Sequence, residues 1–175
     1  MSDKRSIFEE VGNDTKITAA VVGAISRDEG SERGLVRLWL WALVGLIVIM
    51  ITVGGLTRLT DSGLSITEWD PVMGAVPPLN VAAWDVAFAA YKTTAEFTLQ
   101  NTAMSLAEFK TIFWWEWGHR QLGRFIGLVW LTGFLLLLAL GKLPKTRRLL
   151  LFAIGPFIGL QGFIGWLMVN SGLDG

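Results

Sequence analysis

Three long runs without a charged residue constrain this chain more than any other feature. The runs cover residues 38–57, 125–141 and 149–173, and they are 20, 17 and 25 residues long. About 20 apolar residues in a helix cross the hydrocarbon core of a bilayer. The second run is short, but residues 112–117 upstream extend the same helix. We therefore expect an all-α integral membrane protein with three transmembrane helices.

The composition supports a membrane protein and excludes several functional classes. Hydrophobic residues make up 52% of the 175 residues and charged residues 17%, against roughly 25% charged residues in a soluble domain. The formal net charge is zero, so the chain lacks the basic excess of a nucleic-acid-binding protein. The sequence contains no cysteine, which excludes disulfides, thiolate metal sites and a cysteine nucleophile within it.

Charges near the ends of the runs predict the orientation of the helices. Basic residues precede the first run and fill residues 142–148, so we expect both regions to face the cytoplasm. The polar cluster at residues 57–62 predicts an ordered turn on the opposite side. Further along that side, Asn80 and Ser105 are predicted to cap amphipathic helices, the second of which continues into the membrane.

These observations divide the chain into six segments. The predicted segments are a cytoplasmic polar tail (1–37), a first transmembrane helix (38–57), an outer loop with amphipathic helices (58–111), a helix that enters the membrane and forms the second span (112–141), a cytoplasmic basic loop (142–148) and a third transmembrane helix (149–173). A short helix is expected in the tail, which is otherwise predicted to be soluble and partly disordered.

The single histidine, His119, lies where the outer helix is predicted to enter the membrane. Glu116 precedes it by three residues and Gly123 follows it by four, so these residues share one helix face. Such a face leaves a slot beside the imidazole, and helix bundles hold haem in comparable places. Arg120 and Arg124 could pair with haem propionates or with lipid phosphates.

A second interpretation stays open for each of these residues. A lone histidine among tryptophans is often an interfacial side chain, and a single glutamate is often only solvated. Gly123 and Gly127 also match a spacing that brings membrane helices into close contact. Glycines around Gln161 predict close packing of the third helix, with an interhelical hydrogen bond from the amide. Ionisable groups at membrane depth are mostly functional, which favours a site at Glu116 and His119.

Several motifs, in the correct order, resemble the heme A synthase family. The residues GGLTRLT at 54–60 and SGLSI at 62–66 resemble the first outer loop of that family. EWGHR at 116–120 resembles its Glu-Xaa-Xaa-His-Arg element, and GLQG at 159–162 resembles the following span. The resemblance covers about residues 35–175, and the cysteine-free loop is similar to the branch that lacks a loop disulfide.

The resemblance implies eight transmembrane helices in two four-helix halves, each half with two histidines that ligate a haem. It implies oxidation of the C8 methyl group of heme O to the formyl group of heme A, for cytochrome oxidase assembly. His119 would be an axial ligand of the haem iron, with Gly123, Arg120 and Arg124 beside the cofactor. Glu116 would be the acidic residue needed for turnover. Heme b is the implied cofactor and heme O the substrate.

The sequence departs from that pattern, because it holds one histidine and no fourth apolar run. We expect an amino-terminal part of the enzyme that is inactive alone and pairs with the remaining half or self-associates. Other expected partners are the lipid bilayer, an electron donor and heme O synthase, in a multi-pass protein of the inner (plasma) membrane. Two alternatives remain: a haem-binding electron-transfer subunit without hydroxylase activity, and a membrane subunit without haem.

Overall fold

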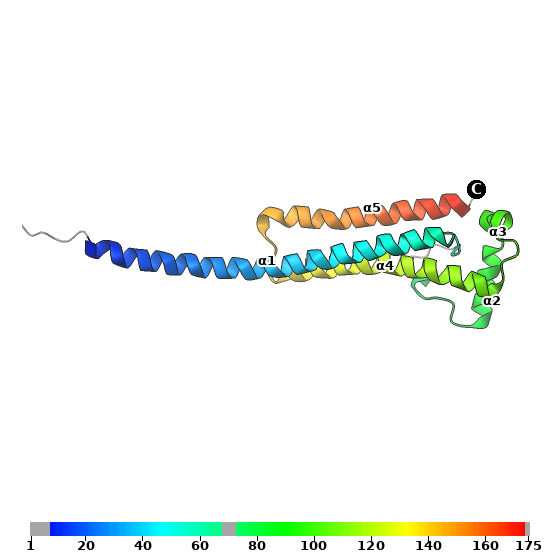
Figure 1. Ribbon diagram of the computed structural model, residues 1–175, viewed down its shortest axis with the longest axis horizontal. Coiled ribbons are helices and arrows are strands. Elements are labelled where there is room, and N and C mark those ends of the chain that lie inside the picture. The colour runs from blue at the N-terminus through cyan, green and yellow to red at the C-terminus, as the bar shows by residue number, and fades with distance from the viewer. Residues whose placement is uncertain (1–7, 68–72, 174–175) are drawn as a thin grey trace, which may run out of the picture.

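The computed structural model describes residues 8–67 and 73–173, whose elements are labelled in Figure 1. These residues form helices and no strand. The elements are α1 (Phe8–Leu59), the 3-10 helix η1 (Met73–Ala75), α2 (Val81–Tyr91), α3 (Ala95–Gln100), α4 (Leu106–Ala139), the 3-10 helix η2 (Lys145–Arg147) and α5 (Arg148–Leu173). Among them, three segments are long and apolar enough to cross a membrane, namely Gly34–Leu59, Leu106–Ala139 and Lys145–Ser171. The prediction of an all-α membrane protein is confirmed.

Helix α1 extends well beyond the first predicted span, because it begins at Phe8. The structure therefore makes residues 8–37 helical, where the sequence predicted a polar tail with only a short helix. This stretch contains no proline. Adding a residue to an existing helix costs much less than starting a new one, so the apolar segment can propagate the helix into polar sequence.

The predicted helix caps are confirmed. The side chain of Asn80 accepts a hydrogen bond from the backbone N–H of Ala83 at 2.8 Å and begins α2. Ser105 and Glu108 form a capping box at the start of α4. Because α4 then continues unbroken to Ala139, the outer helix and the second span are one helix of 34 residues.

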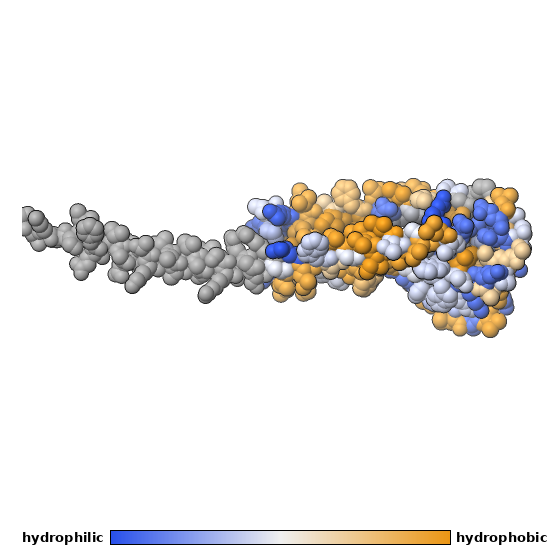
Figure 2. All heavy atoms as spheres, viewed as in Figure 1, coloured by the Kyte–Doolittle hydropathy of each residue, from blue (hydrophilic) through white to orange (hydrophobic). Residues whose placement is uncertain are grey.

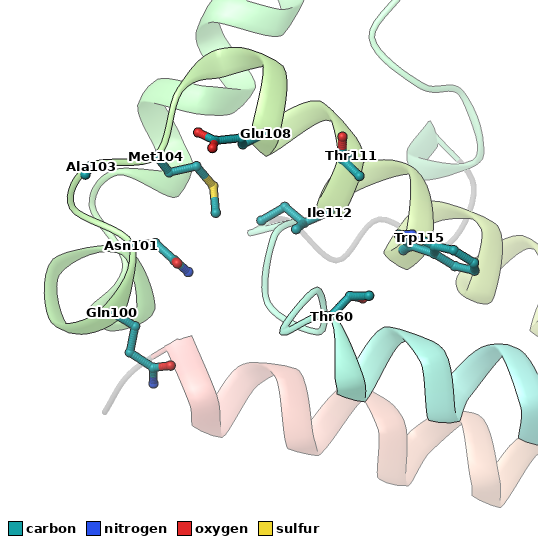
Figure 3. Close-up of a pocket in the computed structure, with 9 residues that line it drawn as sticks. All are labelled: Thr60, Gln100, Asn101, Ala103, Met104, Glu108, Thr111, Ile112 and Trp115. Carbon is teal, nitrogen blue, oxygen red and sulfur yellow. The ribbon is translucent and has the colours of Figure 1, made fainter.

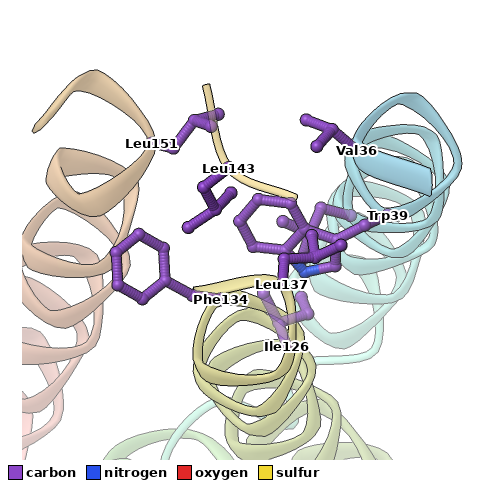
Figure 4. Packing of buried hydrophobic residues seen from close by; sticks show 8 residues of the cluster. Val36, Trp39, Ile126, Phe134, Leu137, Leu143 and Leu151 are labelled. Carbon is purple, nitrogen blue, oxygen red and sulfur yellow. The ribbon is translucent and has the colours of Figure 1, made fainter. Parts of the chain in front are cut away.

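Helix α4 lies between α1 and α5, and side chains from all three meet in one core (Figure 4). Two tryptophans in this core each pack against a glycine of the neighbouring helix. The indole of Trp39 on α1 covers Gly133 and donates to the carbonyl of Val129 on α4 at 3.1 Å. The indole of Trp130 on α4 covers Gly155 on α5 in the same way, so a methyl group at either glycine would overlap a ring.

A second, aromatic core fixes the outer segment against the start of α4. Phe109 on α4 is fully buried and stacks on Phe88 and Tyr91 of α2, with ring centroids 5.0 and 5.2 Å apart. Trp84 packs edge-on against Phe113 with centroids 4.9 Å apart. On the face shown in Figure 2, apolar residues cover the middle of the coloured helices, and polar residues gather toward their two ends.

Candidate functional site

Glu116 is buried on α4, with 3% of its surface exposed, and its carboxylate accepts three hydrogen bonds. Oε2 accepts one from the hydroxyl of Ser65 at 2.6 Å and one from the backbone N–H of Ile66 at 2.8 Å. Oε1 accepts a hydrogen bond from the guanidinium of Arg120, one turn further along α4. The open alternative of a solvated carboxylate is therefore wrong for Glu116.

The loop that reaches Glu116 is ordered by its own hydrogen bonds, as the sequence predicted. The backbone N–H of Ser62 donates to the carbonyl of Thr57 at 2.9 Å, and the hydroxyls of Ser62 and Thr60 lie 2.6 Å apart. Asp61 adopts the left-handed conformation, with φ of 47°, which aspartate tolerates better than most residues. Ser62 and Ser65 are both buried as a result.

Helix α4 holds the outer segment at two further points. Arg120 donates to the carbonyl of Ile66 at 2.9 Å, so Glu116 and Arg120 together bind both polar backbone groups of that residue. Gln121 donates to the carbonyl of Ala75. These contacts place the ion pair of Glu116 and Arg120 at the junction between the loop and the membrane helix.

The imidazole of His119 is half-buried and faces α1. A Cβ atom on Gly54 of α1 would lie 3.0 Å from Nε2, so the ring lies directly against the α1 backbone. A Cβ on Gly123 would lie 3.1 Å from the methyl carbon of Met50, while Gly127 faces open space. Of the two glycines that follow His119 on the predicted face, Gly123 therefore lies at the α1–α4 contact and Gly127 does not, and Met50 fills part of the predicted slot.

The remaining predicted cofactor residue, Arg124, also lies on α4. Its Nη1 donates to Oε1 of Gln121, about one turn earlier on the same helix, at 3.1 Å. The structure thus brings Glu116 and Arg120 into contact and places His119 and Gly123 against α1. The roles of these residues as a haem ligand or as partners of the propionates stay predictions.

The donor set fits a haem better than a bare metal ion. In the part of the chain that the structure describes, no cluster of three or more His, Cys, Asp or Glu side chains could hold a metal. A porphyrin supplies four of the ligands to its iron, so one histidine is enough for one axial position. The imidazole Nε2 lies against the α1 backbone at Gly54, and Met50, an unbranched and flexible side chain, lies beside Gly123. By residue type, a single histidine beside glycines would suit a haem iron better than a bare metal ion.

An open pocket of about 480 Å³ lies at the outer end of the helices (Figure 3). Its lining comes from the end of α1, from α3 and from the start of α4. The lining residues are Thr60, Gln100, Asn101, Ala103, Met104, Glu108, Thr111, Ile112 and Trp115. None of the predicted site residues lines it, so this pocket is separate from the cluster around Glu116.

The interhelical hydrogen bond predicted for Gln161 is not formed within the described chain, because its side chain is exposed. Helix α5 packs on α4 through Gly155. A Cβ atom added at glycine 159, 162 or 165 would have no neighbour within 4 Å. Sequence reasoning also missed Ser65, Ile66 and Gln121 as contacts of the site. The loop motif around Ser65 indicated order, but nothing in it pointed to Glu116.

Comparisons with known proteins agree on one family. Residues 37–175 match the family COX15-CtaA, described as "Cytochrome oxidase assembly protein". Proteins named heme A synthase from Cereibacter sphaeroides, Dinoroseobacter shibae and Ruegeria pomeroyi are 58%, 56% and 56% identical to the chain. These matches cover 98–100% of the chain and 44–46% of the relatives, so the chain spans about half their length. No solved structure matches the chain. The chain belongs to the COX15-CtaA family of cytochrome oxidase assembly proteins.

Proposed function

We propose that this chain works as part of a heme A synthase, the membrane oxidoreductase that converts heme O to heme A for cytochrome oxidase assembly. The names of the similar proteins supply the reaction. The observation in the structure that carries it is the buried carboxylate of Glu116, fixed by an ordered loop and placed on the same helix as the single histidine. A simple haem-binding electron-transfer subunit has no need of such a loop.

His119 would ligate the haem iron in this proposal. A haem b supplies the redox chemistry when bound, and heme O is the substrate. The support is geometric, because the imidazole lies at the α1–α4 contact, where Gly54 has no side chain to displace the ring. Arg120 and Arg124 place two positive charges on the same stretch of α4, which suits the propionates of a haem.

Glu116 is the acidic residue of the reaction in this proposal. Among the described residues, three donors reach the carboxylate of Glu116, from Ser65, Ile66 and Arg120. Its three donors fix the direction of both oxygens. Glu116 can therefore hold or accept a proton at a defined position without rotating.

We also propose an inner-membrane location with the amino terminus in the cytoplasm. The support is the basic cluster between α4 and α5, formed by Lys142, Lys145, Arg147 and Arg148, at the end opposite the outer loop. Large apolar side chains remain exposed on α1 and α5. Lipid, further transmembrane helices of the same enzyme or a second copy of the chain cover them in this proposal.

The test is formation of heme A in cells that make heme O but lack their own heme A synthase. The complete protein should yield heme A, identified by chromatography of extracted haem. His119→Ala should lower haem content, while Glu116→Ala should keep haem but lower the yield of heme A. Glu108→Gln is the control, because this glutamate lies on the same helix and only caps it. Unchanged haem content in His119→Ala, or a normal yield in Glu116→Ala, would contradict the assigned role.

A further inference from the structure

We propose that Ser65 is a positioning residue, which holds the carboxylate of Glu116 in the orientation that the reaction requires. This inference rests on the proposed function. It concerns a residue outside the membrane helices and 51 positions away from Glu116 in the sequence. Ser65 acts through Glu116 and is not itself a catalytic residue.

The contact between the two side chains is buried and short. Ser65 is 2% exposed and Glu116 is 3% exposed, and the hydroxyl lies 2.6 Å from Oε2. The same hydroxyl also lies 3.4 Å from the carbonyl of Ser62. A hydroxyl donates only one proton, and the shorter contact to the charged acceptor takes it. Because both groups are buried, water cannot easily replace the hydroxyl if it is removed.

Ser65 is itself held by the turn that follows α1. The backbone N–H of Ser62 donates to Thr57, and the hydroxyl of Thr57 donates to the carbonyl of Gly54 at 2.8 Å. Gly54 is also the residue against which His119 lies. The segment 54–66 therefore contacts both predicted site residues of α4, His119 at one end and Glu116 at the other. A rigid segment of this kind fixes the two side chains relative to each other.

The three donors to Glu116 differ in what a substitution removes. The Ile66 donor is a backbone N–H, which no side-chain change deletes, and Arg120 contacts the other oxygen. Removing the Ser65 hydroxyl leaves Oε2 with one donor, so the carboxylate is held less firmly while the loop stays bound through Ile66. The expected result is a loss of turnover without a loss of the fold.

The experiment compares Ser65→Ala with Ser62→Ala in the complete protein. Ser62 is the matched control, because its buried hydroxyl contacts Thr60 and not Glu116. Ser65→Ala should lower kcat for heme O about tenfold, the size expected for a lost hydrogen bond to a charged group, with KM and haem content nearly unchanged. Ser62→Ala should stay within about twofold of the wild type. Equal losses in both variants would overturn the proposal, since they would show a general effect on the loop.

A double-mutant cycle separates positioning from a structural role. If Ser65 acts through Glu116, Ser65→Ala should cost nothing further in a Glu116→Ala background, which removes the acceptor of its hydrogen bond, for activity and for melting temperature. Fully additive effects would overturn the proposal. If the wild type makes no heme A, the proposed function fails. The melting temperatures of the wild type, the two single variants and the double variant then decide whether the Ser65 contact exists. Non-additive losses of melting temperature support the contact, and additive losses reject it.

Discussion

A single methyl group on α1 tests how closely the helix approaches the predicted haem ligand. In Gly54→Ala, the new Cβ would lie 3.0 Å from Nε2 and 3.5 Å from Cδ2 of His119, where ordinary contacts are 3.4–4 Å. The imidazole must therefore move by a few tenths of an ångström. A ligand has to be held within about 0.5 Å of its working position, and this shift uses up much of that tolerance. We therefore expect haem affinity to fall about tenfold, the lower end of the loss seen when residues that orient metal ligands are changed.

The assay is haem titration of the purified protein, followed by its absorbance spectrum. The neighbouring variant Gly55→Ala is the control, because no atom lies within 4 Å of a Cβ at that position. Both changes raise helix propensity by about 0.5–1 kcal/mol, so the difference between them isolates the contact with His119. Equal haem affinity and identical spectra in the two variants would refute the proposed approach of α1 to the ligand.

Two further predictions concern the packing and the pH response. Gly155→Ala should lower the melting temperature, at a cost of about 1–3 kcal/mol for overpacking against an indole ring of α4, whereas Gly159→Ala, with open space around it, should not. Burial, and then the charges of Glu116 and Asp61, raise the pKa of Glu96 from 4.5 to about 7. The folded state therefore favours the protonated form, so stability should be greatest below about pH 4.5 and fall as the pH rises through about 7. Melting temperatures between pH 5 and 8 should show this fall in the wild type and a smaller one in Glu96→Gln, and equal slopes would contradict it.

The sequence predicts the parts of this fold that depend on neighbouring residues. The three apolar runs became α1, α4 and α5, because spanning a bilayer requires an unbroken apolar helix. Asn80 and Ser105 cap their helices through contacts only three residues long, which a local pattern specifies. Helix α3 (Ala95–Gln100) was missed, since it is six residues long and Phe97 packs it against the rings of Phe88 and Tyr91 on α2.

The candidate site depends on contacts that a single sequence cannot reveal. Glu116 and His119 stood out by residue type and position, but two of the three donors to Glu116 come from Ser65 and Ile66, about fifty residues earlier. Pairing between such distant segments is decided by how α1 packs on α4. The same packing places Met50 beside Gly123, so part of the slot that the glycine spacing predicted is filled.

The most direct test of haem binding through His119 is a reduced-minus-oxidised absorbance spectrum of the purified protein, with its extracted haem identified by chromatography. We expect a bound haem in the wild type, a large loss of it in His119→Ala, and full retention in Glu116→Ala. A wild type that binds no haem, or a His119→Ala variant with the same spectrum and haem content, would contradict the central claim that His119 holds a haem in a heme A synthase.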